Sequence, residues 1–333
     1  MLVILVRGSA PASKTQITRK NNGKVSENQS VAKLLKEKAA ASAMERVICE
    51  TLVSQIQALQ ALDFVIRVCG IDTLYSELCG IRVDWVITIG DNLLYLKACR
   101  LIYKRVPIVG INLDPNATKG SLCLFGSCLP RIVSNFRDIM EFHVARQRIQ
   151  VEIIYPEFKE RIEKRTDVNK EVYNVLNEIY IGNVKKEEAS EMELLQAGGF
   201  QAKKIKFQEI MMLTGTGYHF RKDSFNKMEM SKAKVLDMYR ELDEDTANRL
   251  MEFKIQGYEL NENSKKFVAI TKKYNKKVGL DTSIMERTKM GLVTREDNLL
   301  VVLDGVKNMK LPKGTLLIFT MERETSLNTY RND

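Results

Sequence analysis

The chain has 333 residues, of which 44% are hydrophobic, and it carries a formal net charge of +10. This length exceeds what one compact core usually holds, so we expect two domains. No apolar run reaches the roughly 18 to 20 residues that a membrane helix needs, which excludes a helical membrane protein. The positive charge favours an anionic partner, which could equally be a nucleotide, polyphosphate, nucleic acid or an acidic surface.

The N-terminal segment supports two interpretations. Residues 1–26 contain five Lys or Arg and no acidic residue, a composition typical of a mitochondrial transit peptide. Residues Met1–Arg7 are also apolar enough for a buried strand. We interpret them as the first strand of the fold, so that any import signal would lie elsewhere.

Helix and strand patterns alternate over the next hundred residues. The patterns predict helices over 31–60, 71–79 and 92–102, and strands over 62–69, 83–89 and the start of 107–115. Such alternation is typical of a parallel sheet flanked by helices, which binds ligands at the carboxyl ends of its strands.

After about residue 145 the pattern changes to short β-rich runs. We predict strands over 148–154, 175–182, 189–195, 207–213, 267–271, 299–303 and 315–320, with a helical insertion near 222–253. The expected organisation is therefore an α/β domain over 1–145, a largely antiparallel β-rich domain over 146–300, and a C-terminal segment over 301–333 that partly returns to the first domain.

The cysteines do not indicate a metal centre. All six lie within the first 128 residues, mostly in apolar patterns where a free thiol packs as a small hydrophobic side chain. The two histidines, His143 and His219, lie far from them in sequence, so we expect no protein-bound metal site and a reducing compartment.

Four segments carry the chemistry. An apolar run ends at Gly90 and becomes helix-forming within a few residues, a turn whose free N–H groups favour an anion. An Asn112-Leu-Asp114-Pro turn follows the next strand, Asn177 and Glu178 stand side by side in an apolar run, and Leu213 to Gly217 form a second glycine-bearing loop.

In order and spacing, these segments resemble the NAD kinase family, particularly its mitochondrial branch. The resemblance spans roughly residues 80–320. It implies a Rossmann-like α/β domain plus a β-rich domain, ATP as phosphoryl donor with Mg²⁺ as cofactor, NADP as product, a homodimer and a mitochondrial matrix location. The family positions expected to bind NAD and ATP are Gly90, Asp114, Asn177, Glu178, Thr214, Gly215, Thr216 and Gly217.

The turn at Gly90 departs from the family's Gly-Gly-Asp-Gly-Thr motif, whose Asp is the base that takes the ribose proton. The matching positions are Gly90, Asp91, Asn92, Leu93 and Leu94, and only the first is retained. Asn92 stands where the base should be, and a carboxamide cannot take a proton at working pH. Asp91 would supply the carboxylate if the turn shifted by one residue, so we place catalysis at Asp91 and Asn92. Leu93 would be strained if its position required a positive φ.

The second loop matches the family through Gly217 and then departs from it. Bulky residues follow, namely Tyr218, His219, Phe220 and Arg221, where the family usually has small or hydroxylated ones. They are expected to narrow or reshape the adenine pocket, while a plain hairpin turn is the alternative for residues 214–217. A late Asp304-Gly305 pair resembles a family turn and is equally compatible with a simple β turn.

The resulting hypothesis is a NAD kinase, with alternatives that stay open. The first is a catalytically impaired paralogue that binds nucleotide or a sister subunit, and the second is a lipid kinase of the same fold. Two features argue against the lipid kinase, namely the Asn177-Glu178 pair and the Asn112-to-Pro115 turn. Nucleic acid is not an expected partner, because the chain has no basic stripe interleaved with aromatic residues and no reader motif.

Overall fold

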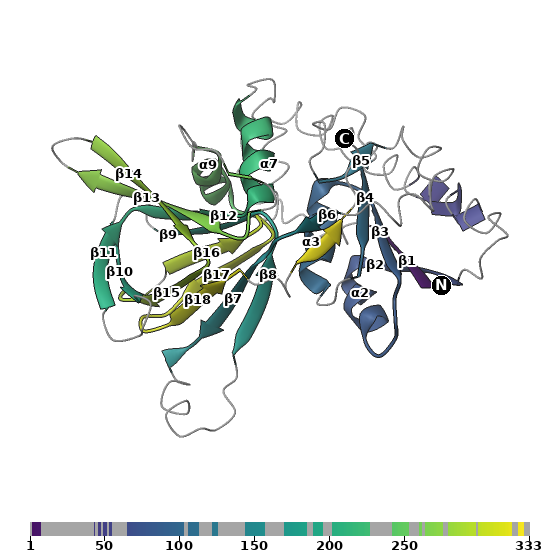
Figure 1. Cartoon of the computed structure of the whole chain (residues 1–333), viewed down its shortest axis with the longest axis horizontal. Coiled ribbons are helices and arrows are strands. Elements are labelled where there is room, and N and C mark those ends of the chain that lie inside the picture. Colours follow the sequence, from purple (N-terminus) through teal and green to yellow (C-terminus); the bar gives the residue numbers. More distant parts are fainter. Residues whose placement is uncertain are drawn as a thin grey trace, which may run out of the picture. The chain divides into compact units, whose positions relative to one another are not determined.

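The computed structural model describes residues 2–7, 65–102, 106–112, 122–125, 144–156, 170–184, 189–195, 202–226, 242–252, 260–261, 264–275, 279–297, 299–321 and 326–329, with single positions between 43 and 54. The chain divides into two compact units (Figure 1). The first, here called the α/β unit, comprises Met1–Ile102, Val106–His143 and Tyr330–Asp333. The second, the β unit, comprises Tyr103–Arg105 and Val144–Thr329.

The α/β unit contains a parallel sheet with the strand order β2-β1-β3-β4, and β5 pairs with β4. Its strands are β1 (Leu2–Arg7), β2 (Val65–Gly70), β3 (Trp85–Ile89), β4 (Ile108–Asn112) and β5 (Leu124–Phe125). Helix α2 (Ile71–Leu78) follows β2, and α3 (Asn92–Leu101) follows β3. Every residue of β3 and β4 is buried, as expected for parallel strands covered on both faces.

The sequence predictions for this unit are largely confirmed. The strand interpreted over Met1–Arg7 is confirmed over Leu2–Arg7, and Val3 to Val6 are completely buried at its centre. The predicted strands and helices between 62 and 112 correspond to β2, α2, β3, α3 and β4. The described positions between 43 and 54 are helical, while the rest of the predicted 31–60 helix lies outside the described residues.

The β unit contains two antiparallel sheets. The outer sheet has the order β11-β10-β15-β18-β7-β8 and the inner sheet the order β14-β13-β12-β9-β16-β17. The outer strands are β7 (Ile149–Ile154), β8 (Glu171–Val175), β10 (Ser190–Leu195), β11 (Ala202–Phe207), β15 (Lys289–Thr294) and β18 (Leu316–Thr320). The inner strands are β9 (Glu178–Asn183), β12 (Glu209–Leu213), β13 (Phe267–Asn275), β14 (Gly279–Arg287), β16 (Leu299–Leu303) and β17 (Lys307–Leu311). A short pair, β6 (Val144–Arg146) and β19 (Leu327–Thr329), completes the unit.

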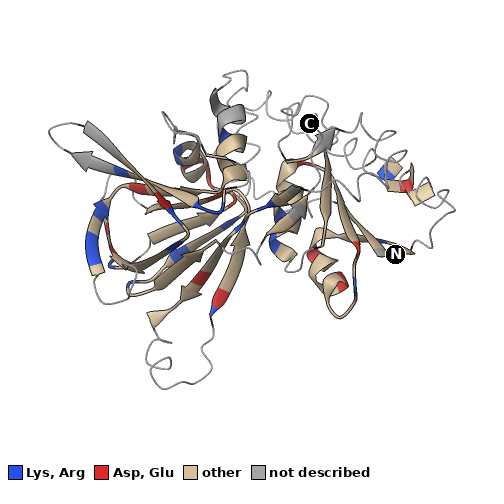
Figure 2. Ribbon diagram, in the orientation of Figure 1, with Lys and Arg blue, Asp and Glu red and all other residues tan. Residues whose placement is uncertain are grey.

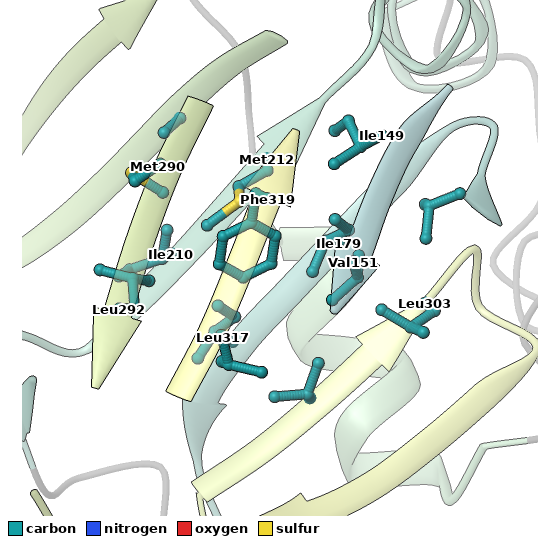
Figure 3. Close-up of a cluster of buried hydrophobic side chains, with 14 of the residues drawn as sticks. Ile149, Val151, Ile179, Ile210, Met212, Met290, Leu292, Leu303, Leu317 and Phe319 are labelled. Atoms are coloured by element: carbon teal, nitrogen blue, oxygen red, sulfur yellow. The ribbon is translucent and has the colours of Figure 1, made fainter. Parts of the chain in front are cut away.

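The central strands of the inner sheet are buried on both faces, which explains the almost continuous apolar runs of β9, β12 and β16. Successive side chains of a strand point to opposite faces. In β9, Ile179 and Ile181 therefore face the outer sheet, where they join a core with Phe319 and Met212 (Figure 3). Tyr180 faces the other way, into a second core with residues of helices α7 (Gly215–Asn226) and α9 (Glu244–Glu252). These helices cover the inner sheet (Figure 1).

The strands that the sequence pattern missed are mostly edge strands. β8 and β11 end the outer sheet, and β14 and β17 end the inner sheet. Edge strands face water and carry charged residues that discourage pairing with other chains, so they lack an apolar signal. Figure 2 shows the extreme case, β11, where blue Lys residues dominate the strand.

The predicted helical insertion near 222–253 needs a correction at its start. Helix α7 begins at Gly215, directly after β12, and α9 forms the later part of the insertion. None of the helices in the described part of the chain combines the length and apolar character needed to cross a bilayer.

Candidate functional site

The turn at Gly90 connects the buried strand β3 to helix α3. The Gly90 N–H donates to the Ile111 carbonyl at 2.9 Å, so the strand remains hydrogen-bonded up to the turn. A Cβ on Gly90 would lie 2.7 Å from Leu94 Cδ2, so the absence of a side chain lets the first turn of α3 approach this closely. The sequence thus places the N-terminus of a helix at the carboxyl end of a parallel strand, where such folds bind ligands.

Asp91 is the N-cap residue of α3. Its Oδ1 accepts a hydrogen bond from the Leu94 N–H at 2.8 Å, and the Asp91 carbonyl accepts from the Tyr95 N–H at 3.2 Å. A carboxylate at this point is stabilised by the positive end of the helix dipole. The predicted carboxylate is therefore present at the turn, in Asp91.

Asn92 is the first residue of α3, and its Oδ1 is buried without a hydrogen-bond partner. Leu93 and Leu94 lie within the first helical turn, with exposures of 4% and 5%. Leu93 therefore has helical backbone angles and escapes the strain that a positive φ would impose; Asp304 is the non-glycine residue with a positive φ in the described part of the chain. The two leucines that replace the glycine and threonine of the family motif are therefore accommodated as buried core residues.

The next strand ends at Asn112, which is buried with 6% exposure. Asp114, the carboxylate predicted in the turn that follows, lies outside the described residues.

In the β unit, Asn177 lies at a sharp bend and Glu178 begins β9. The prediction of one continuous strand over 175–182 is wrong, because β8 ends at Val175 and β9 starts at Glu178. Both side chains are buried, with exposures of 2% and 3%.

Thr214 joins this bend to the start of α7. Its Oγ1 accepts from the Gly217 N–H at 3.0 Å, as an N-cap side chain does, and donates to the Leu176 carbonyl at 2.5 Å. The Thr214 N–H donates to the Asn177 carbonyl at 3.0 Å. Residues 214–217 therefore form a strand-to-helix turn, and the alternative of a plain hairpin turn is wrong.

Gly217 is packed directly against the bend. A Cβ at this position would lie 1.9 Å from the Asn177 carbonyl oxygen, a distance that no side chain tolerates. The second glycine of the Thr-Gly-Thr-Gly segment is thus required for the close approach of α7 to Asn177.

The bulky residues after Gly217 have definite places. Tyr218 is 4% exposed and packs in the core between the helices and the inner sheet, with the His219 ring edge-on at a centroid distance of 5.4 Å. The side chain of Phe220 lies outside the described residues. Arg221 turns toward β9, and its Nε donates to Glu178 Oε2 in a buried ion pair.

The Arg221 guanidinium also links two helices. Its Nη1 donates to the Leu250 carbonyl at 2.9 Å, one of the last carbonyls of α9, which have no partner within the helix. The Glu178 carboxylate, expected to bind ribose, therefore has a protein partner of opposite charge. The family motif gave no signal for this arginine, which stands beyond the motif's end.

Two polar atoms beside the bend lack partners. Asn177 Oδ1 and Thr216 Oγ1 are buried without a hydrogen bond, in residues with exposures of 2% and 0%. Buried polar groups are normally paired, so such atoms are suited to a ligand that donates or accepts hydrogen bonds. A polyhydroxylated ligand such as a ribose meets this requirement.

The described residues include no group of three or more His, Cys, Asp or Glu side chains that could hold a metal ion. Mg²⁺ bound with a nucleotide needs only one or two protein carboxylates, since phosphates and water complete its shell. Asp91 is a carboxylate of the required kind.

Comparison with known proteins gives a match at the level of structure alone. No protein-family model and no curated protein sequence matches the chain. Among solved structures, yeast NADH kinase complexed with NADH superposes with a TM-score of 0.52 at 12% identity, over 80% of this chain and 66% of the yeast chain. An NAD kinase from Archaeoglobus fulgidus in complex with ATP superposes with a TM-score of 0.51 at 13% identity, over 100% of this chain and 94% of the archaeal one. The protein thus has the two-part fold of the NAD kinases, a parallel α/β sheet followed by an antiparallel β-rich unit.

Proposed function

We propose that this protein is a NAD kinase, which transfers a phosphoryl group from ATP to the 2′-hydroxyl of the adenosine ribose of NAD and forms NADP. The shared fold supports this proposal, since both neighbours described above are kinases of this class, one with NADH and one with ATP. The observation that carries it is the Asp91 carboxylate, held at a strand-to-helix turn where phosphate-binding sites form.

Asp91 is the base in this proposal. The 2′-hydroxyl oxygen forms a bond to the γ-phosphorus of ATP, the bond from that phosphorus to the β-phosphate oxygen breaks, and ADP leaves. The hydroxyl proton passes to the Asp91 carboxylate. Mg²⁺ bound with ATP would supply positive charge to the phosphates. Asn92, beside Asp91, is a hydrogen-bonding group of the same turn.

The β unit supplies the nucleotide-binding groups. Asn177 and Thr216 present buried polar atoms without partners, and Gly217 keeps the surrounding backbone close. Glu178, Thr214 and Gly215 belong to the same bend and helix start. Asp114 and Gly90 complete the proposed positions for NAD and ATP.

The first test is formation of NADP by the purified full-length chain from NAD and MgATP, measured with an NADP-specific cycling assay. Asp91→Asn keeps an N-cap residue but removes the base, so we expect a loss of about 100- to 10,000-fold in kcat. Asp72→Asn is the matched control, because Asp72 is an exposed acid in the first turn of α2, and it should keep full activity. Equal activity of wild type and Asp91→Asn would remove Asp91 as the base.

A second function is favoured by one observation, the ion pair of Glu178 with Arg221. A carboxylate engaged in this way binds a ribose less readily, which fits a paralogue that binds nucleotide or a sister subunit without turnover. Calorimetric binding of NAD with no NADP formed would select it. Phosphorylation of diacylglycerol in vesicles, without NADP formation, would select the lipid kinase instead.

We further propose a homodimer in the mitochondrial matrix. Light scattering of the purified protein tests the oligomeric state, and imaging of the tagged chain in cells tests the compartment.

A further inference from the structure

The bend that carries Asn177 is held by a carboxylate from a distant part of the chain. Asp304 Oδ1 accepts from the Asn177 N–H at 2.6 Å and from the Glu178 N–H at 3.1 Å. Its Oδ2 accepts from the Leu176 N–H at 2.9 Å. Asp304 is 3% exposed, so these three bonds form away from water, where a charged acceptor binds N–H groups most strongly.

The turn that contains Asp304 is built for this contact. Asp304 and Gly305 have φ values of 52° and 65°, and the Val306 N–H donates to the Leu303 carbonyl at 2.9 Å. These are the features of a tight turn whose two central residues both have a positive φ, a conformation that Asp-Gly favours, and the turn lies in the three-residue connection between β16 and β17. The Asp304 N–H donates back to the Glu178 carbonyl at 2.8 Å, so the turn and the bend are bonded in both directions.

Both backbone groups of Asn177 are therefore fixed. Its N–H is bound by Asp304, and its carbonyl accepts from the Thr214 N–H at 3.0 Å. Gly217 packs against the same carbonyl, which leaves the peptide no room to rotate. The Asn177 side chain keeps an Oδ1 without a hydrogen-bond partner. The backbone N–H and carbonyl of Asn177 are thus hydrogen-bonded within the protein, and its side-chain Oδ1 is available to accept a hydrogen bond from a ligand.

We infer that Asp304 is a positioning residue for the nucleotide: it fixes the bend at 176–178 so that the Asn177 carboxamide is already oriented when NAD arrives. This inference rests on the proposed function. Asp304 does not touch the reacting atoms. It acts through the backbone of Asn177, because a ligand-binding group held in place before binding loses less freedom when the ligand binds.

The test is NAD binding by calorimetry to the full-length chain, which needs no turnover. Asp304→Asn retains the size of the side chain but turns one acceptor into a donor that faces an N–H group. We expect the Kd for NAD to rise at least tenfold while the number of sites per folded chain is unchanged. A merely structural role would lower the number of competent sites and leave the Kd as it was, which would overturn the inference.

Asp297→Asn is the matched control. The Asp297 carboxylate also accepts from a backbone N–H, that of Lys313 at 2.8 Å, in an exposed turn away from the bend. The Asp297→Asn variant should have a Kd for NAD within twofold of the wild-type value. A rise equal to that of Asp304→Asn would contradict a specific role for Asp304.

Asn177→Ser tests the same inference with Asp304 intact, including the case in which Asp304→Asn does not fold. Asn177→Ser should raise the Kd for NAD at least tenfold. The double variant Asp304→Asn/Asn177→Ser should have a Kd little higher than that of Asn177→Ser, because both changes act through the Asn177 carboxamide. Unchanged NAD binding by Asn177→Ser would overturn the inference.

The same measurements separate failure of the inference from failure of the proposed function. If the wild-type chain binds no NAD at all, the proposed function itself fails. If the wild-type chain binds NAD tightly and Asp304→Asn binds it equally well, only the role of Asp304 is removed.

Discussion

At the scale of single residues, two buried carboxylates near Asn177 have different partners. Asp304 accepts from three backbone N–H groups, while Glu178 pairs with the side chain of Arg221. Both satisfy the rule that a buried charge must be paired. The charge of Glu178, on strand β9, is neutralised by Arg221 of helix α7, so the site depends on α7 as well as on β9.

The ion pair leads to a prediction about stability. Arg221→Met removes one partner of a buried pair and leaves the Glu178 carboxylate uncompensated, so the free energy of unfolding should fall by about 3 to 5 kcal/mol. Lys170→Met is the control, because the exposed pair of Lys170 with Glu152 should contribute about 1 kcal/mol or less. Urea unfolding followed by circular dichroism measures both variants. Equal, small losses would show that the Arg221 pair is not buried as described.

The sequence predicts Asp91, Asn177 and the Thr214-to-Gly217 segment as site residues, but it does not reveal which residues hold them in place. Asp304 lies 127 residues from the backbone N–H of Asn177 that it binds, and Arg221 lies 43 residues from Glu178. Contacts over such separations depend on the topology of the sheet, which a local pattern does not contain. Asp304-Gly305 was recognised as a turn, and only the structure gives the carboxylate its second role.

At the scale of elements, helix α9 is capped by Asp243. Its carboxylate accepts from the Thr246 N–H at 2.9 Å and from the Thr246 hydroxyl at 2.8 Å. Partial burial alone would raise the pKa of Asp243, but these hydrogen bonds and the charge of Arg249 hold the pKa below its ordinary value of 3.8. Because α9 packs on the inner sheet and Arg221 binds its Leu250 carbonyl, the cap helps to hold the site in place.

A pH-dependent contribution follows from this cap. A carboxyl whose pKa is lower in the folded state stabilises that state above its ordinary pKa, and the contribution is lost as pH falls through the folded-state value. Asp243→Ala should therefore cost about 0.5 to 2 kcal/mol near pH 7, and its difference from wild type should shrink as pH falls below the ordinary carboxyl pKa of 3.8. Thermal unfolding across this range measures the difference. Asp243→Asn keeps a capping oxygen, so its loss near pH 7 should be smaller, and this loss should also shrink at low pH because the titrating group is the wild-type carboxyl. A difference between wild type and Asp243→Ala that stays constant with pH would contradict the account.

The sequence signal for a strand is clearest where both of its faces are buried. Strands β3, β4, β9, β12 and β16 have apolar runs that the sequence shows directly. Edge strands β11 and β17 are rich in Lys, because one side of an edge strand faces water, and their pattern resembles that of a loop. The bend at Asn177 escaped prediction because Leu176 is apolar and continues the run across it.

At the scale of the whole molecule, the fold was predictable because element order survives changes at single positions. Alternating helices and strands followed by β-rich runs indicate a parallel sheet and then an antiparallel unit, which the structure and the two kinase neighbours share. At 12% and 13% identity the neighbours determine the fold, and the chemistry must be argued from side chains. In the Gly-Asp-Asn-Leu-Leu turn, different residues stabilise the fold and carry the proposed chemistry. The two leucines pack in the core, and the aspartate caps the start of α3.

The central claim is that this turn still supports phosphoryl transfer to a dinucleotide. Incubation of the purified chain with NAD and ATP labelled in the γ-phosphate, followed by chromatographic separation of the nucleotides, tests it directly. We predict label in the 2′-phosphate of NADP for the wild type and almost none for Asp91→Asn. Absence of labelled NADP from a wild-type chain that binds both nucleotides would contradict the claim.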